Sequence, residues 1–188
     1  MASVPYQVRY FVAVWPTEEV LDALGALPRP EFDGARWSTR DQWHVTLRFF
    51  GELDQAGVAR ASRALAKAAA HLSGPLEARG GPSTRFMGPG LIIWPVEGLA
   101  EAARTVERVT AKIGKPPPSR PFRGHLTVAR ARGEADLRQA GQLLAPLEMS
   151  WEAGSLSLVR SELHPNGARY TEVAVFPLGR QAPERQLR

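Results

Sequence analysis

Two short stretches of the chain repeat one pattern, and they constrain its fold more than any other feature. Residues 44–47 and residues 125–128 both read His, apolar residue, Thr, apolar residue. Both lie in runs rich in β-branched and aromatic residues, which predicts a strand in each case. Successive side chains of a strand alternate between its faces. His44 and Thr46 are therefore predicted to share one face, as are His125 and Thr127, while the apolar residues of each copy face the core.

The number and spacing of the copies indicate an internal duplication. The chain has four His and eight Thr, so two matched copies are hard to attribute to chance. His44 and His125 are 81 residues apart, and each predicted motif strand is followed by a predicted helix. Little else repeats at the level of single residues. The order of elements thus predicts two similar α+β lobes, each contributing one motif.

Hydrophobic periodicity and turn residues divide the rest of the chain into short elements. The predicted strands cover residues 8–15, 43–50, 76–79, 86–87, 91–94, 124–130, 151–159 and 169–176, and the predicted helices cover residues 17–24, 54–72, 98–113 and 137–147. Thr17 is the expected N-cap of the first helix, Asp54 begins the second, and three prolines at 116–118 prevent the third from continuing. We expect one bilobed domain over residues 1–180 and a basic tail at 181–188.

Composition narrows the possible partners and location. The formal net charge is +5 and most of the cations are Arg, which favours a polyanion such as nucleic acid. The absence of Cys excludes disulfides and thiolate metal ligands. No run of about 18 apolar residues is present and no secretory signal is recognisable, so we expect no membrane association and a cytoplasmic protein. A monomer is expected because a single bilobed cleft needs no partner.

Two imidazoles facing each other across a cleft would form an acid–base pair. Histidine has an unperturbed pKa of about 6.5, so one ring can accept a proton while the other donates one. Phosphodiester cleavage without a metal needs such a pair, and Thr hydroxyls with an Arg can hold the phosphate oxygens. Metal binding is the alternative use of two His, but no Asp, Glu or third His recurs at ligand spacing near either motif. Two His packed in a core are the remaining alternative.

The two motifs resemble the paired His-x-Thr-x sequences of the 2H phosphoesterase superfamily. The resemblance is to its RNA 2′,3′-cyclic phosphodiesterase branch, first described as 2′-5′ RNA ligases, and it extends over most of the chain. It is carried by residues 9–13, 44–51, 121–130, 158–161, 167, 170 and 176–178. Gly124 and Val128 depart from the branch, where Pro and Leu are commoner, but neither change removes a chemical group.

This resemblance implies a fold and a reaction. The implied fold is α+β, with two antiparallel sheets, flanking helices and a pseudo-two-fold active-site cleft between the lobes. The implied reaction is hydrolysis of an RNA terminal 2′,3′-cyclic phosphate to a 2′-phosphomonoester, with neither metal nor cofactor. By the same resemblance His125 would activate water and His44 would protonate the departing 3′ oxygen, while Thr46 and Thr127 would hold the phosphate. Residue types alone leave the two His roles interchangeable.

The remaining candidates differ in how strand alternation places them. Arg130 would join the phosphate site, but it follows His125 by five residues, so a β-bulge or the end of the strand near Ala129 must turn it to the same face. Arg48 has the parity of His44 and is a rival contact to phosphate or to backbone. Tyr170 is a candidate for stacking a terminal base. Trp43 and Phe49 could also stack, but their parity predicts core packing.

Several functions remain compatible with the paired motifs and the candidate site residues. The first is the cyclic phosphodiesterase described above, acting on RNA. Related activities are reversible 2′-5′ ligation and hydrolysis of 2′-5′ linkages or of another cyclic nucleotide. A module that binds RNA ends without catalysis is the alternative outside the enzymes.

Overall fold

The part of the chain that the structure describes forms two antiparallel sheets and three helices. The computed structural model describes residues 7–29, 34–132, 137, 145–164 and 167–179. One sheet has four strands in the order β10-β9-β1-β3, and the other has the order β2-β7-β6-β4-β8 with β5 paired to β6. The strands are β1 (Val8–Val14), β2 (Ala35–Trp37), β3 (Val45–Gly51), β4 (Leu76–Gly80), β5 (Arg85–Phe86), β6 (Leu91–Glu97), β7 (His125–Ala131), β8 (Met149–Ala153), β9 (Ser155–His164) and β10 (Gly167–Pro177). The helices are α1 (Glu18–Ala26), α2 (Gln55–His71) and α3 (Ala100–Thr110), with a 3-10 turn, η1, at Arg40–Gln42.

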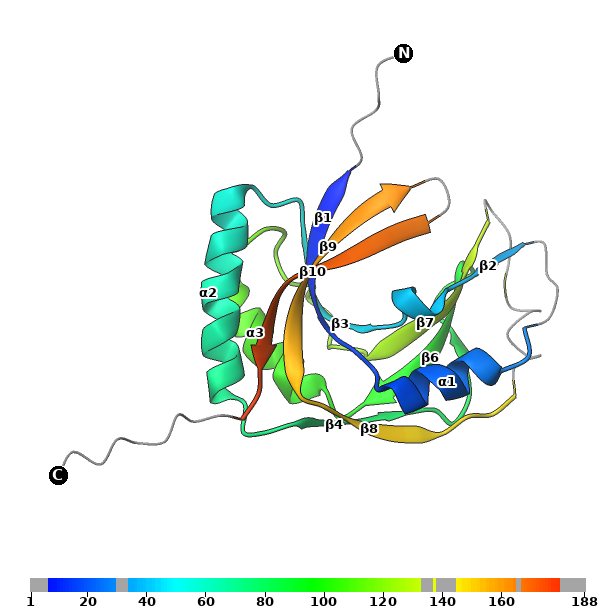
Figure 1. Ribbon diagram of the computed structural model, residues 1–188. Helices are drawn as coiled ribbons and strands as arrows, with labels where there is room; N and C mark the ends of the chain where they lie inside the picture. The colour runs from blue at the N-terminus through cyan, green and yellow to red at the C-terminus, as the bar shows by residue number, and fades with distance from the viewer. Residues whose placement is uncertain (1–6, 30–33, 133–136, 138–144, 165–166, 180–188) are drawn as a thin grey trace, which may run out of the picture.

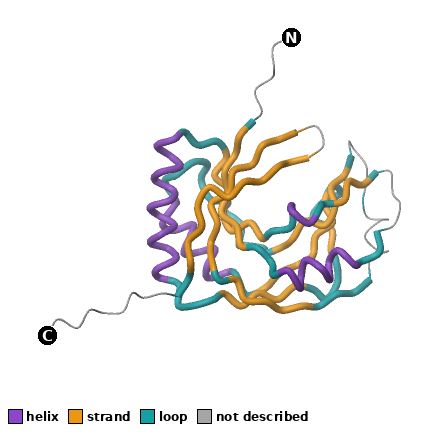
Figure 2. Tube along the Cα trace, in the orientation of Figure 1, coloured by secondary structure: helices purple, strands orange, loops and turns teal. Residues whose placement is uncertain are grey.

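The helices cover the sheets from outside. In Figure 1, α2 and α3 lie side by side next to the four-stranded sheet, and they contact β9, β10 and β3. Helix α1 lies against β8 of the other sheet. Figure 2 shows the strands gathered in the middle of the molecule, with α2 and α3 to one side. The α+β class with two antiparallel sheets, predicted from the motifs and the resemblance, is confirmed.

Local sequence explains where α2 and α3 begin. The Asp54 side chain accepts a hydrogen bond from the Gly57 amide at 2.6 Å, which caps α2. Thr17, the predicted N-cap of α1, is at the N-cap position but makes no side-chain capping bond. Helix α3 is shorter than the predicted 98–113. Gly98 has φ +91° and a Cβ there would lie 2.0 Å from the Glu77 carbonyl oxygen, so this residue forms a turn against β4 and the helix begins after it.

Two strands differ from the sequence-based prediction. The strand predicted over 151–159 divides at Gly154 into β8, which pairs with β4, and β9, which pairs with β1. The chain therefore passes from one sheet to the other at this point. Strand β2 was not predicted; it has three residues and pairs with the motif strand β7. Most of the predicted helix at 137–147, and the basic tail at 181–188, lie outside the described residues.

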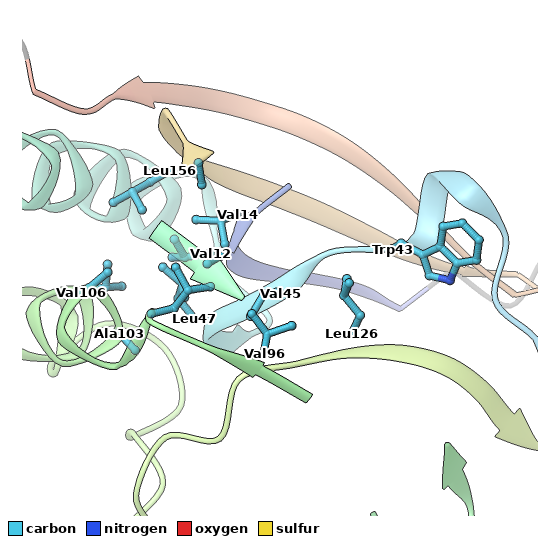
Figure 3. Close-up of a cluster of buried hydrophobic side chains, with 14 of the residues drawn as sticks. Val12, Val14, Trp43, Val45, Leu47, Val96, Ala103, Val106, Leu126 and Leu156 are labelled. Carbon is cyan, nitrogen blue, oxygen red and sulfur yellow. The ribbon is translucent and has the colours of Figure 1, made fainter. Parts of the chain in front are cut away.

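One continuous core lies beneath both motif strands. It joins Val45 and Leu47 of β3 to Leu126 of β7 and to α2 and α3 (Figure 3). Trp43 also belongs to this core and is 2% exposed, as its parity predicted. Each motif strand pairs with the strand that precedes it in the same lobe, β3 with β1 and β7 with β6. The two lobes thus present one motif each, on the side of the sheets away from this core.

Candidate active site

Both motif strands carry a β-bulge at the same position of the motif. In β3, Thr46 lies opposite Ala13 and Arg48 lies opposite Val12, so Leu47 is an extra residue. In β7, Thr127 pairs with Ile93 and Ala129 with Ile92, which leaves Val128 extra. The bulged residue is in both cases the fourth of His-x-Thr-x. An extra residue reverses the alternation of the side chains that follow it.

In β3 this reversal overturns two predictions. Phe49 pairs with Phe11, and Phe11 shares a face of β1 with Ala13, the partner of Thr46. Phe49 therefore lies on the face of Thr46 and is 39% exposed, where strict alternation predicted a core position. Arg48 lies instead on the core side and is 3% exposed. Its predicted position on the face of His44 is wrong.

The Arg48 guanidinium is directed to the protein backbone. It donates to the carbonyl oxygens of Phe49 and Lys115, and to that of Ile113 at 3.4 Å. These bonds tie β3 to the loop that follows α3. Of the two uses considered for Arg48, phosphate and backbone, the structure has the backbone contact.

In β7 the same reversal brings Arg130 to the motif face. Arg130 pairs with Leu91, which shares a face of β6 with Ile93, the partner of Thr127. The bulge that Arg130 requires is therefore present. The charge of Arg130 also lowers the pKa of His44 and of His125, so the guanidinium lies near both rings.

The two imidazoles have equivalent hydrogen bonds. The Nδ1 atom of His44 lies 2.8 Å from the carbonyl oxygen of Gln42, and that of His125 lies 2.8 Å from the carbonyl oxygen of Arg123. Because a carbonyl oxygen only accepts, we assign the ring proton to Nδ1 in each case. Nε2 is then the atom available for proton transfer. The Thr46 hydroxyl lies 3.0 Å from Nε2 of His44 and donates to it in this tautomer.

Three aromatic rings enclose His44. Phe11 stacks on it with ring centroids 4.7 Å apart, and Tyr170 and Trp15 meet it edge-on at 4.9 and 5.5 Å. Tyr170 thus packs against His44. Neither Phe11 nor Trp15 was predicted as a site residue. The sequence did indicate that they share a face, because they are four residues apart in the first predicted strand.

A polar network fixes the Trp15 ring. Its Nε1 donates to the Ser157 hydroxyl at 3.1 Å and to the Glu172 carboxylate at 3.0 Å. The Ser157 hydroxyl in turn donates to Glu172 at 2.5 Å. Ser157 is fully buried, so the network lies beneath the site.

Burial keeps both histidines neutral at neutral pH in the free protein. The pKa of His44 is lowered to about 4, and burial is the largest cause. The hydrogen bond to the Gln42 carbonyl raises this pKa, while the charges of Arg130 and His125 lower it further. Burial also lowers the pKa of His125, where Arg130 and Arg120 add to the effect and the Arg123 carbonyl opposes it. A charge on His125 lowers the pKa of His44, so the two rings lie near each other, and strands β3 and β7 are in contact. Both Nε2 atoms can then accept a proton.

A cavity of about 350 Å³ adjoins the two motifs. Thr46 and His125 line it from opposite strands, and the aromatic rings of Phe49 and Phe122 face it together with Lys115. A larger hollow, about 870 Å³, lies between the end of α2 and strands β4 and β8. It contains no residue of either motif, so we place the site at the smaller cavity. Within the described ranges, no three His, Asp or Glu side chains gather as a metal site.

Fold and site together define a class of protein: an α+β fold whose two sheets each carry one His-x-Thr-x strand, with both imidazoles presented through Nε2. Residues 21–165 match the model of the 2′-5′ RNA ligase superfamily. The chain therefore belongs to that superfamily.

Relatives span most of the chain. An RNA 2′,3′-cyclic phosphodiesterase of Thermus thermophilus is 32% identical over 185 residues, which cover 91% of this chain and 90% of the relative. An RNA 2′,3′-cyclic phosphodiesterase of Methanothermobacter thermautotrophicus is 30% identical over 149 residues, 72% of this chain and 78% of its own.

Solved structures share the fold. The crystal structure of TT0787 from Thermus thermophilus has a TM-score of 0.75 at 26% identity, covering 93% of this chain and all of its own. That of Escherichia coli LigT complexed with 3′-AMP has a TM-score of 0.72 at 18% identity, covering 93% and 99%. Among the described residues, no helix is long and apolar enough to cross a membrane.

Proposed function

We propose that this protein hydrolyses the terminal 2′,3′-cyclic phosphate of RNA to a 2′-phosphomonoester, with His44 and His125 as the acid–base pair. The observation that carries the proposal is the equivalence of the two Nδ1 atoms, each bonded to the carbonyl two residues earlier, which leaves Nε2 as the unprotonated nitrogen of both rings. The two relatives named RNA 2′,3′-cyclic phosphodiesterase support the choice of substrate.

The steps follow from the groups at the site. The hydroxyls of Thr46 and Thr127 and the guanidinium of Arg130 bind the non-bridging oxygens of the cyclic phosphate. One Nε2 takes a proton from a water molecule, whose oxygen attacks phosphorus. The bond from phosphorus to the 3′ oxygen breaks. The second ring, which is protonated at this stage, gives its Nε2 proton to that oxygen. The product carries a 3′ hydroxyl and a 2′ phosphate.

The electrostatic environment of the two rings bears on which one is the general acid and which one is the general base. In our proposal His125 accepts the proton and His44 donates one. With a pKa of about 4, His44 holds a proton only when the negative charge of the bound phosphate raises that pKa. The same low pKa suits His44 to the base role, so the reverse assignment is the alternative to be tested.

The first experiment is product analysis with a short RNA that ends in a 2′,3′-cyclic phosphate, with a chelator present. We expect the wild type to form a 2′-phosphate, and His44→Ala and His125→Ala each to lose about 10²–10⁴-fold in rate. His71→Ala is the matched control, because His71 is exposed at the end of α2. An intact cyclic end with the wild type, or full activity in either site variant, would contradict the proposal.

A sulfur substrate separates the two roles. A thiolate leaves without protonation, so replacing the 3′ bridging oxygen by sulfur removes the need for the acid. We expect this substrate to restore the rate of His44→Ala and to leave His125→Ala slow. Rescue of His125→Ala alone would reverse the assignment.

The name of the superfamily favours a second activity at the same site. If the 5′ hydroxyl of another RNA replaces water as the nucleophile, the same proton transfers would form a 2′-5′ linkage. Adding an RNA with a free 5′ hydroxyl to the product analysis would detect the ligated strand.

A further inference from the structure

A second hollow continues the active-site cavity along the protein surface. It has a volume of about 730 Å³ and shares Met87, Arg120, Phe122 and Arg123 with the cavity at the motifs. The two form one groove, which begins at Thr46 and His125 and reaches β5. We call this groove, from the motifs to Arg85 and Phe86, the β5 groove.

Aromatic rings are spaced along the β5 groove. Phe49 lies at its beginning and is 39% exposed, and Phe86 lies at its far end and is 36% exposed. The half-buried Phe122 lines both parts. Phe49 and Phe86 are large apolar side chains that remain partly exposed, which a buried-core role does not explain. Such rings stack nucleic acid bases without regard to sequence.

Positive charge accompanies the rings. Arg85, Lys115, Arg120 and Arg123 are exposed on the walls of the β5 groove, and within the described ranges none of them makes a salt bridge. Lys115 lies over the Phe49 ring, 5.9 Å from its centroid.

The two carboxylates on the groove walls are offset by cations of their own. Glu97 lies 4.0 Å from Arg79, and Glu107 acts on the charge of the buried Arg48. The β5 groove therefore has a net positive charge, which is complementary to a phosphodiester backbone.

We propose that the β5 groove binds the RNA strand on the 5′ side of the cyclic phosphate. The proposal rests on the proposed function, because the cyclic end placed at the histidines leaves the remaining strand to extend in the 5′ direction. Continuity with the site and complementary charge favour RNA over a peptide. Phe49 and Phe122 stack the bases nearest the cyclic end, and Phe86 with Arg85 holds the next part of the strand.

The test compares a long substrate with a short one. For each variant we would measure kcat/KM on a ten-nucleotide RNA with a 2′,3′-cyclic end and on a cyclic mononucleotide, which does not reach β5. We expect Arg85→Gln and Phe86→Ala each to lower the ratio of the two kcat/KM values about tenfold. Arg63→Gln on α2 and Leu163→Ala on β9 are the matched controls, because both residues are exposed and neither lines the groove.

Direct binding keeps the proposal testable if catalysis fails. The dissociation constant of a labelled ten-nucleotide RNA would be measured over a range of salt concentrations. We expect Arg85→Gln to weaken binding and to reduce the salt slope by about 0.7, the value for one phosphate contact on a single strand. Suppose that the wild type hydrolyses both substrates, and that neither variant changes the ratio of kcat/KM values or the affinity for RNA. The proposal that the β5 groove binds RNA is then overturned, and the proposed function stands. If the wild type hydrolyses neither but the variants weaken RNA binding, the function is overturned and the groove stands.

Discussion

The His44 ring lies among three aromatic rings, with its Nδ1 proton held by a backbone carbonyl and its Nε2 beside a hydroxyl. The paired motifs made His44 and His125 recognisable from the sequence. The depressed pKa of His44 was not, because it depends on burial, and His44 packs against Phe11 of β1 and Tyr170 of β10, strands at opposite ends of the chain.

We expect stability to fall in acid because of His44. Its pKa is about 4 in the folded protein and about 6.5 when unfolded, so the unfolded chain binds the proton first and stability is lost as pH falls from about 6.5 to about 4. Between pH 7.5 and pH 5, the free energy of unfolding should decrease by about 1–2 kcal/mol more in the wild type than in His44→Gln. Urea unfolding at both pH values measures this difference. An equal decrease in His44→Gln would contradict the low pKa of His44 in the folded protein.

The element that decides the site is the bulged strand. Strict alternation placed His44, Thr46, His125 and Thr127 correctly, because these residues precede the bulges. It failed for Arg48 and Phe49, which follow Leu47. A bulge in β7, or an end of the strand near Ala129, was expected only because Arg130 needed one of the two to reach the motif face. Residues 151–159 were predicted as one strand, although their apolar positions change phase between Ala153 and Leu156, where the chain changes sheets. Which strand pairs with which neighbour depends on contacts distant in the sequence.

Arg48→Met should destabilise the protein. The substitution leaves the carbonyls of Phe49, Ile113 and Lys115 without the guanidinium, and hydrogen bonds to charged groups contribute about 1.5–3 kcal/mol each. We expect a loss of about 2–4 kcal/mol in the free energy of unfolding, measured in urea. Arg63→Met on the exposed face of α2 should change it by less than about 0.5 kcal/mol. A normal stability combined with a raised KM would instead indicate that Arg48 binds substrate.

At the scale of the whole molecule, the two lobes share one core. Buried residues of both sheets belong to the same cluster, from Val12 in β1 to Leu126 in β7. The motifs predicted two lobes, but the shared core could not be predicted, because it depends on how the lobes pack. The two motif strands stay in contact only while this packing holds.

We expect the lobes to unfold in a single transition. Amide hydrogen exchange should give β1 and β6 the same free energy of opening, since each strand packs on the shared core. Leu126→Ala, at a fully buried position in β7, should lower both values together by about 2–5 kcal/mol. A decrease confined to β6 and β7 would show that the lobes unfold separately.

The exchange of strands between the two halves makes each half incomplete. Strand β2 comes from the first half of the chain and pairs with β7 in the second lobe, while β9 and β10 come from the end of the chain and complete the first lobe. A chain divided in the turn after α2 would give two fragments that each lack strands held by the other. Catalytic activity would then be measurable only when the two fragments associate, so the divided molecule is suited to detect the proximity of two proteins fused to them.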